Sequence, residues 1–385
     1  MSRQLCMALT FGMVCCVACS PNEDDAVAES SDLSDGSDAT DVTDSSDPTE
    51  VPDTSDASSA PGGDDPSDGS VTEEDRCTQI QTSITAAGLG DRVTVRCDAS
   101  YAYIAGDTYP AHDVMNGIVG TNEQIPVPAP SYEAPIPLVP ARAAQVTTRD
   151  SALAVADNGV PIYDYTAGGE ITMDADGNAE YDSRLDTVLI GQLDNCGGHS
   201  GRGDDYHYHK EPNCMLEGMA NREANPIIGW AFDGYPLYGK TNPDGSAIAE
   251  GTLEPCHGQP DDVYGYRYHT SNTQPYIIKC LRGVVDVDRL PRVSAFRDGG
   301  TPIEVDGLTY TTTANADGTA TRRLSYTYRA SDYYIEYQTR LDSQYCFDIE
   351  AEMCNSDRGE CAGLSQNSCK CRSLPSGESA PAGCN

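Results

Sequence analysis

Hydrophobic and polar positions follow different patterns in successive parts of this 385-residue chain. An apolar stretch from Leu5 to Ala18 is followed by residues 20–75, which are rich in Ser, Asp, Thr, Pro and Gly and have only scattered small apolar residues. Further along, short alternating stretches predominate, as at Val93, Val95 and Cys97. Alternation with a period of two places the apolar side chains on one face of a strand. The pattern therefore predicts a mainly β protein behind an unstructured N-terminal segment.

Other local signals complete this outline. Ile80 and Ile84, four residues apart, would share one face of a short helix. Residues 301–345 predict additional strands, with a turn at residues 315–318 (Asn-Ala-Asp-Gly). The Pro-rich residues 122–141 predict an extended connection over a surface rather than a helix.

A repeat runs through the middle of the chain, from about residue 155 to 285. Residues 193–196 (Leu-Asp-Asn-Cys) are matched 60 positions later by Leu-Glu-Pro-Cys, and residues 206–209 (Tyr-His-Tyr-His) are matched at the same offset by Tyr-Arg-Tyr-His. Residues 158–163 (Asn-Gly-Val-Pro-Ile-Tyr) are echoed 75 positions later by Asp-Gly-Tyr-Pro-Leu-Tyr, whose Asp-Gly predicts a tight turn between strands. We therefore predict two copies of one β unit, at about 155–214 and 230–280, that form one pseudo-symmetric domain.

The charge is strongly negative and unevenly distributed. The chain has 24 Lys plus Arg and 61 Asp plus Glu, a net charge of −37, and residues 20–75 hold 19 acidic residues and no basic one. Such a segment buries too little apolar surface to offset its ordering entropy, and its like charges extend it. We expect residues 19–75 to form a disordered acidic stalk. The lack of Lys and Arg clusters excludes nucleic acid as a partner, and it excludes a basic membrane-binding patch.

Residues 1–18 have the form of a signal peptide, with Arg3 before the apolar stretch. Residues 16–19 (Cys-Val-Ala-Cys) resemble a bacterial lipobox, although Cys16 stands where Leu is usual. The resemblance implies lipid attachment at Cys19. The protein would then contact the membrane through that lipid only, anchored in the bacterial cell envelope at the outer membrane or cell surface. The alternative is plain secretion, with Cys19 as an incidental thiol.

Cysteine usage is typical of an oxidised, exported protein, since 12 of the 16 cysteines follow Cys19 and their number is even. We expect these twelve to form disulfides: Cys77, Cys97, Cys196, Cys214, Cys256, Cys280, Cys346, Cys354, Cys361, Cys369, Cys371 and Cys384. Cys77 is expected to pair with Cys97.

Residues 346–385 form a small cysteine-rich module whose cysteine spacing resembles that of EGF-like domains. The resemblance implies the pairs Cys346–Cys361, Cys354–Cys369 and Cys371–Cys384. Six cysteines allow 15 pairings, so a different connectivity stays open.

Five of the six histidines fall within 71 residues of the repeated region: His199, His207, His209, His257 and His269. On a strand, His207 and His209 would lie side by side on one face, with Tyr206 and Tyr208 on the other. Pseudo-twofold packing of the two copies would bring all five histidines to one site. Clustered imidazoles suit a transition metal, and outside the cytoplasm copper is favoured over zinc. The sixth histidine, His112, is at most an additional ligand. Alternatively, these histidines bind no metal and only form hydrogen bonds to tyrosines and to the backbone of turns.

Carboxylates near this cluster supply further candidates. Asp194 and Glu254 occupy matching repeat positions, which favours a structural or ligand-orienting role in both halves over catalysis. Asp205 or Asp233 could act as a general base beside a metal-bound water, although Asp233 is first of all a turn residue. The sequence has no Ser–His–Asp order, phosphate loop or nucleotide fingerprint.

Together, these motifs resemble the YHYH-domain family of exported bacterial proteins. The resemblance covers roughly residues 105–290 and rests on residues 196–199, 206–209, 229–239, 268–269 and 275–276. It implies a secreted or surface-anchored domain in which the histidine motif is central, and it implies no particular reaction.

Three functions follow as hypotheses. The first is a cell-surface lipoprotein whose β domain, residues 76–345, binds copper, with Tyr206, Tyr208, Tyr266 and Tyr268 packed around the site. The second is a zinc-dependent extracellular hydrolase acting on a polymer. The third is a disulfide-rich adhesion protein without metal, whose partner is an extracellular protein or polymer. All three require the same fold: mainly β, pseudo-duplicated and disulfide-stapled, between an acidic stalk and a cysteine-rich module.

Overall fold

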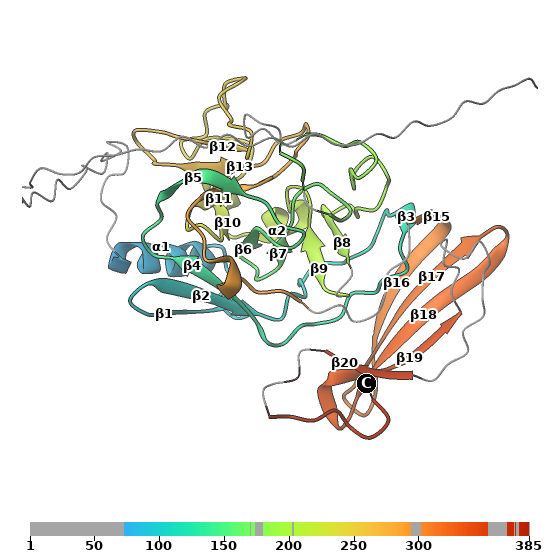
Figure 1. The fold of residues 1–385 in the computed structure, drawn as a ribbon. Coiled ribbons are helices and arrows are strands. Elements are labelled where there is room, and N and C mark those ends of the chain that lie inside the picture. The colour runs from blue at the N-terminus through green and yellow to red at the C-terminus, as the bar shows by residue number, and fades with distance from the viewer. Residues whose placement is uncertain are drawn as a thin grey trace, which may run out of the picture. The chain divides into compact units, whose positions relative to one another are not determined.

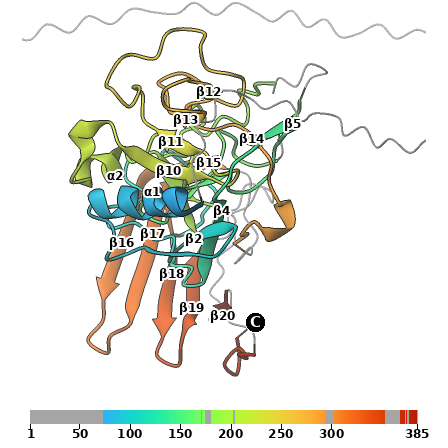
Figure 2. The same ribbon diagram turned by 90° about the vertical axis from the view of Figure 1, so that its left-hand side faces the viewer.

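The structure of this chain is a computed structural model, and it describes residues 73–169, 171–173, 180–201, 204–293, 302–352, 368–372, 374 and 377–384. All of them fall within the compact unit Gly63–Asn385. This part of the chain is mainly β, as predicted (Figures 1 and 2). The expected signal peptide, the lipidated Cys19 and the stalk up to residue 72 lie outside the described residues.

The first part of the described chain is a helix beside a three-stranded antiparallel sheet of order β1-β2-β4 (Figure 2). Its elements are α1 (Glu73–Ala86), β1 (Thr94–Cys97), β2 (Tyr101–Gly106) and β4 (Tyr132–Pro137). The helix begins within the segment that we expected to be unstructured. Ile80 and Ile84 are buried on α1, as their spacing predicted. A disulfide joins Cys77 of α1 to Cys97 of β1, which confirms the predicted pair.

Short elements connect the larger sheets. They are β3 (Gly120–Thr121) with β15 (Ile303–Glu304), β5 (Arg142–Thr147) with β14 (Leu281–Gly283), α2 (Asn213–Gly218), and the 3-10 helices η1 (Arg222–Ala224) and η2 (Val287–Arg289). The Pro-rich residues 122–141 are extended rather than helical, as predicted. The expected position over a surface is wrong, because Ile125 and Val127 have no exposed surface and residues 132–137 form strand β4.

The centre is an eight-stranded sheet of order β12-β13-β11-β10-β6-β7-β9-β8 (Figure 1). Its strands are β6 (Ala154–Ala156), β7 (Pro161–Ile162), β8 (Gly198–Ser200), β9 (Tyr206–Tyr208), β10 (Ile227–Ala231), β11 (Pro236–Tyr238), β12 (Gly258–Gln259) and β13 (Arg267–His269). The middle pair, β6 and β10, is antiparallel, with Trp230 opposite Val155 and both fully buried. Helix α1 packs against β10.

The two halves of this sheet have the same topology on either side of β6 and β10. Each half continues outward with a hairpin (β6–β7 or β10–β11), then a parallel strand (β9 or β13), then an antiparallel strand at the edge (β8 or β12). Both hairpins turn at a glycine with left-handed backbone, Gly159 (φ 81°) and Gly234 (φ 90°). The repeat predicted from the sequence is therefore a repeat of strand order about the central pair.

Each half also has its own disulfide. Cys196 pairs with Cys214 in the first half, and Cys256 pairs with Cys280 in the second. The matched positions of Cys196 and Cys256, each just before an edge strand, show that the disulfides are part of the repeated unit.

The C-terminal part is a five-stranded antiparallel sheet of order β16-β17-β18-β19-β20 (Figure 1). Its strands are β16 (Asp306–Ala314), β17 (Ala320–Tyr328), β18 (Ser331–Arg340), β19 (Ser343–Glu352) and β20 (Ser368–Cys371). The predicted turn at residues 315–318 joins β16 to β17. Because β19 contains Cys346, the sheet runs across the module boundary expected at residue 346.

The EGF-like pairing of the tail is wrong. Cys346 pairs with Cys371, and Cys369 pairs with Cys384. The physical reason is the sheet register, in which Cys346 and Cys371 are direct neighbours across β19 and β20. The remaining two cysteines of the tail, 354 and 361, lie outside the described residues.

Candidate metal centre

Three histidines at the outer edge of the first half form the candidate metal centre. Strands β8 and β9 pair so that His199 and His207 are directly opposite one another. His209 follows two residues after His207 and projects on the same side. One ring nitrogen from each histidine lies within 4.8 Å of the other two, and all three side chains are buried. This triad, His199–His207–His209, could hold a metal ion.

Two of the three ring nitrogens lie as close together as two ligands of one metal ion. Nε2 of His209 lies 3.1 Å from Nε2 of His199. Two imidazoles bound tetrahedrally at about 2.0–2.1 Å from zinc would place their nitrogens roughly 3.3 Å apart. His207 donates its Nδ1–H to the carbonyl of Asp205 (3.1 Å), and His209 donates its Nδ1–H to the carbonyl of Asp164. Such bonds fix the two rings and keep their protons on Nδ1, so that each Nε2 has the lone pair that a metal ion needs. Without an ion, Nε2 of His209 uses this lone pair to accept a hydrogen bond from Nε2–H of His199.

Burial keeps the triad neutral. Burial is the largest cause that lowers the pKa of His209 to about 4, although the bond to the Asp164 carbonyl opposes it. Burial, reinforced by the neighbouring His209, also lowers the pKa of His199 and His207 well below the ordinary value. Neutral imidazole is the form that binds metal. At neutral pH the triad therefore needs to release no proton before a cation binds.

Two residues that the sequence reasoning did not single out shape the triad. The ring of Tyr163 stacks on the ring of His207, with 4.0 Å between centroids and 26° between planes. A Cβ at Gly201 would collide with Cε1 of His207, so glycine leaves the room that this ring occupies. Tyr163 could have been identified from the sequence, because it ends the repeated motif of residues 158–163. Nothing in the sequence marks Gly201.

Asp194 holds the loop that leads into β8. Its Oδ1 accepts the backbone N–H of Cys196 (2.9 Å) and of Gly198 (3.1 Å), and its Oδ2 accepts the N–H of Met115 (2.8 Å). The hydroxyl of Tyr206 donates to the same carboxylate at 2.8 Å. Burial raises the pKa of Asp194, and these donors oppose the rise. Asp194 therefore has a structural role, as its position in the repeat predicted.

The other tyrosine of the motif also binds away from the histidine face. Tyr208 accepts a hydrogen bond from Nδ2 of Asn158 (3.0 Å), and its hydroxyl lies 2.8 Å from Nε2 of His112. His112 is thus tied to Tyr208 and is not part of the triad. It lies near the sulfurs of Cys196 and Cys214, but these are joined in a disulfide.

His257 and His269 lie at the opposite edge of the sheet, and the expectation that all five histidines meet is wrong. Strands β7, β6, β10 and β11 separate β9 from β13. The two copies are joined through β6 and β10, so that their matching outer strands diverge. His257 donates its Nδ1–H to the carbonyl of His269 (2.8 Å), and His269 donates its own to the carbonyl of Gly239 (2.9 Å). Burial lowers the pKa of both histidines to about 4.

The two candidate bases differ in their surroundings. Oδ2 of Asp233 accepts from the Tyr268 hydroxyl (2.6 Å) and from the N–H of Arg282 (3.0 Å) and Gly283 (2.7 Å), so Asp233 anchors the second half. Asp205 is next to the triad in sequence, and burial raises its pKa to about 6. Its Oδ2 has no hydrogen-bond partner within the described part of the chain.

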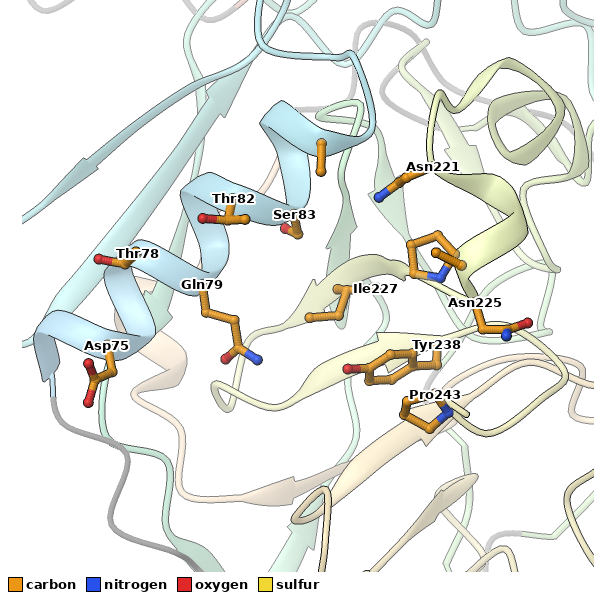
Figure 3. Close-up of a pocket in the computed structure, with 13 residues that line it drawn as sticks. Asp75, Thr78, Gln79, Thr82, Ser83, Asn221, Asn225, Ile227, Tyr238 and Pro243 are labelled. Atoms are coloured by element: carbon orange, nitrogen blue, oxygen red, sulfur yellow. The ribbon is translucent and has the colours of Figure 1, made fainter. Parts of the chain in front are cut away.

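A cavity of about 520 Å³ lies elsewhere, between α1 and the β10–β11 hairpin (Figure 3). Thr78, Gln79 and Ser83 of α1 face Asn221 and Tyr238 across it. None of the triad histidines lines this cavity, so it is not an entrance to the candidate metal centre.

Five disulfides among the described residues are typical of an extracellular or periplasmic protein. In the same residues, no helix has the length and apolar character needed to cross a membrane.

Comparison with curated proteins and with solved structures gave no match. Residues 133–253, which include the triad but end before β12 and β13, match the family described as YHYH protein. This stretch of the chain is thus a YHYH family domain, and it contains the buried histidine triad.

Proposed function

We propose that this protein binds one transition-metal ion, copper in preference to zinc, through His199, His207 and His209. The observation that carries the proposal is the convergence of three buried, neutral imidazoles, two of whose rings are held by backbone carbonyls. Cations of this class prefer imidazole, and the order of affinities for divalent ions places Cu²⁺ above Zn²⁺.

The residues around the triad have distinct tasks under this proposal. The carbonyls of Asp205 and Asp164 orient two of the rings, and Tyr163 covers the face of His207. A bound ion would supply Lewis acidity or, in the case of copper, one-electron chemistry. Metal capture or one-electron transfer is the function that this site supports best.

A zinc-dependent hydrolase is the second candidate function. It is favoured by Asp205, whose buried Oδ2 has no hydrogen-bond partner in the described part of the chain. Under this candidate Asp205 would accept a proton from a water beside the triad. Spectroscopy separates the two candidates, because Cu(II) bound to imidazoles absorbs visible light and gives an EPR signal, whereas zinc does neither.

The place of action that we propose is the bacterial cell envelope, with the lipid on Cys19 as the only membrane contact and the acidic stalk as spacer. Its support is the signal-peptide pattern, the lipobox-like residues 16–19 and the disulfides of the folded part. An extracellular protein or polymer would be accessible as a partner from this position.

Metal content tests the proposal. The full chain, produced without a His tag in an oxidising compartment, is analysed by ICP-MS beside the variant His207→Ala/His209→Ala. We expect about one copper or zinc ion per chain in the wild type and almost none in the variant, because one imidazole cannot hold the ion alone.

His257→Ala is the matched control, since it removes a buried histidine at the other edge of the sheet and should leave the metal content unchanged. Circular dichroism reports whether each variant is folded. A folded wild type that is still empty after incubation with Cu(II) and Zn(II) would contradict the proposal.

The shape of the site gives a second prediction. Gly201→Ala should weaken metal binding at least about 10-fold, because the new Cβ would displace the ring of His207. Isothermal titration with Zn(II) measures the change. Gly218→Ala is the control, since a Cβ there would meet nothing within 4 Å beyond its chain neighbours and the backbone of its own helix. Unchanged affinity in Gly201→Ala would show that His207 is not a ligand.

A further inference from the structure

The second half of the central sheet holds different side chains at the positions of the triad. At the repeat offset of 60, His199 corresponds to Gln259, His207 corresponds to Arg267, and only His209 keeps its histidine, as His269. The pair His199–His207 across β8 and β9 has its counterpart in Gln259–Arg267 across β12 and β13.

The backbone around these positions is the same in both halves. The N–H of Asp194 donates to the carbonyl of Gly198 (2.9 Å), as that of Glu254 does to Gly258 (2.7 Å). The N–H of His209 donates to the carbonyl of residue 197 (3.0 Å), and that of His269 donates to the carbonyl of residue 257 (3.0 Å). Both histidines also donate their Nδ1–H to the carbonyl of the equivalent residue, at position 164 or 239. The two sites therefore have one framework and differ in their side chains.

A guanidinium lies where the first half has a ligand. Arg267 has no exposed surface, and its Nη2 donates to Oδ1 of Asn242 (2.7 Å) and lies 3.3 Å from a carboxylate oxygen of Asp261. Gln259 donates to the same Asn242 oxygen at 2.9 Å. A buried cation thus binds the edge strands to the neighbouring loops, which is what a structural metal ion does.

The side-chain hydrogen-bond partners of Arg267 exist only in the second half. Asp261 stands where the first half has Gly201, and Asn242, at the offset of 75, stands where it has Ala167. The first half has glycine at this position, where a side chain would collide with His207. The half with the histidine at this place therefore has glycine beside it, and the half with the arginine has aspartate. Within each half, the two residues fit one another.

One side-chain nitrogen of the second half has no partner among the described residues, and it belongs to the one histidine that both halves have in common. Nε2 of His269 is buried and has no hydrogen-bond partner within the described part of the chain. In the first half the equivalent atom of His209 lies beside Nε2 of His199. A buried polar atom without a partner costs free energy, so it calls for an explanation. The unpaired nitrogen is explained if His269 is retained from a histidine site like that of the first half.

We infer that the second half is a copy of the metal site in which the guanidinium of Arg267, at the position of the ligand His207, takes over the bonding role of the ion. The inference rests on the proposed function of the first half. It means that the chain binds one ion and not two, and that the edge strands β12 and β13 are held by a built-in cation that no chelator removes. It also means that three exchanges, at residues 259, 261 and 267, separate this site from one that binds a divalent transition metal.

The test is to restore the site with Gln259→His/Asp261→Gly/Arg267→His in the full chain and to measure bound zinc after equilibration with Zn(II). We expect the stoichiometry to rise from about one to about two per chain. Adding His207→Ala/His209→Ala to the triple variant should bring it back to about one, now held at the second site.

The outcomes distinguish this inference from the proposed function. If the wild type and the folded triple variant each bind one ion, the inference is overturned and the proposed function stands. If neither binds any, both are overturned. Should the triple variant fold only with zinc present, as followed by circular dichroism, the inference is supported. A triple variant that zinc does not fold, together with a folded Asp261→Gly/Arg267→His variant that gains no zinc, overturns it, and so does failure of both variants to fold with zinc.

Discussion

Replacing Asp194 by alanine should lower the free energy of unfolding by about 3 kcal/mol or more. The carboxylate accepts three backbone N–H groups, from Met115, Cys196 and Gly198, and the hydroxyl of Tyr206. Alanine leaves these donors buried without an acceptor, at a cost of about 1–3 kcal/mol for each group that finds no other partner. Chemical denaturation of the full chain measures the loss.

The same substitution should weaken metal binding at the triad. Gly198 begins β8, and His199 follows it, so the loop that Asp194 holds also positions one ligand. We expect at least about a 10-fold loss of zinc affinity, as is usual when a group that orients a ligand is removed.

Glu254→Ala is the matched control for this prediction, because the repeat places Glu254 at the equivalent position. Its carboxylate is 27% exposed and binds Arg142 (3.0 Å) and the Tyr266 hydroxyl (3.2 Å), with no backbone N–H among these partners. Partly exposed ion pairs contribute little, so we expect a loss of about 1 kcal/mol and unchanged metal affinity. Equal losses in the two variants would contradict the structural role assigned to Asp194.

Asp157→Asn should stabilise the protein at pH 7, by about 2 kcal/mol or more. Asp157 has no exposed surface, its Oδ1 lies 3.4 Å from Oγ of Ser83, and its Oδ2 has no partner in the described part of the chain. Burial, weakly opposed by Ser83, raises the pKa of this carboxyl to about 8. At pH 7 the folded state therefore keeps a proton that the unfolded state has released.

The sign of the pH dependence follows from this difference. Between pH 4 and 8 the folded state binds more protons at Asp157 than the unfolded state, so the stability contributed by this group falls as the pH rises. Asparagine does not titrate. The difference in unfolding free energy between variant and wild type should therefore grow by about 1.4 kcal/mol per pH unit from pH 5 to 7. Urea denaturation at several pH values measures it.

Asp182→Asn is the control with the opposite sign. The guanidinium of Arg184 holds the pKa of the partly exposed Asp182 at about 2, so any stability from this group is present at neutral pH and is lost in acid. A difference between Asp157→Asn and the wild type that does not change with pH would show that Asp157 is ionised in the folded protein.

Much of the fold could be predicted from patterns of short range. The alternation at residues 93–97 and the turn at 315–318 involve residues that are close in sequence, and both are present in the structure. The tail is different, because the pairing of Cys346 with Cys371 depends on the register of two strands that are 25 residues apart. Cysteine spacing alone contains no information on that register.

The candidate site could be predicted only in part. The His-x-His spacing placed His207 and His209 on one face, and burial then made both neutral. The symmetry of the repeat suggested five converging histidines, but a repeat in sequence does not say whether matching strands meet or diverge. The central β6–β10 pair makes them diverge.

The sequence by itself determined that this protein is mainly β, that its central part contains an internal repeat, and which residues are chemically able to bind a metal. Those properties follow from local alternation, from spacing and from the types of side chain present. Only the tertiary structure decided that His199, His207 and His209 come together while His257 and His269 lie at the other edge. The reason is that ligand geometry and burial depend on which strands pair across the sheet, and this pairing is set by packing between residues far apart in the chain.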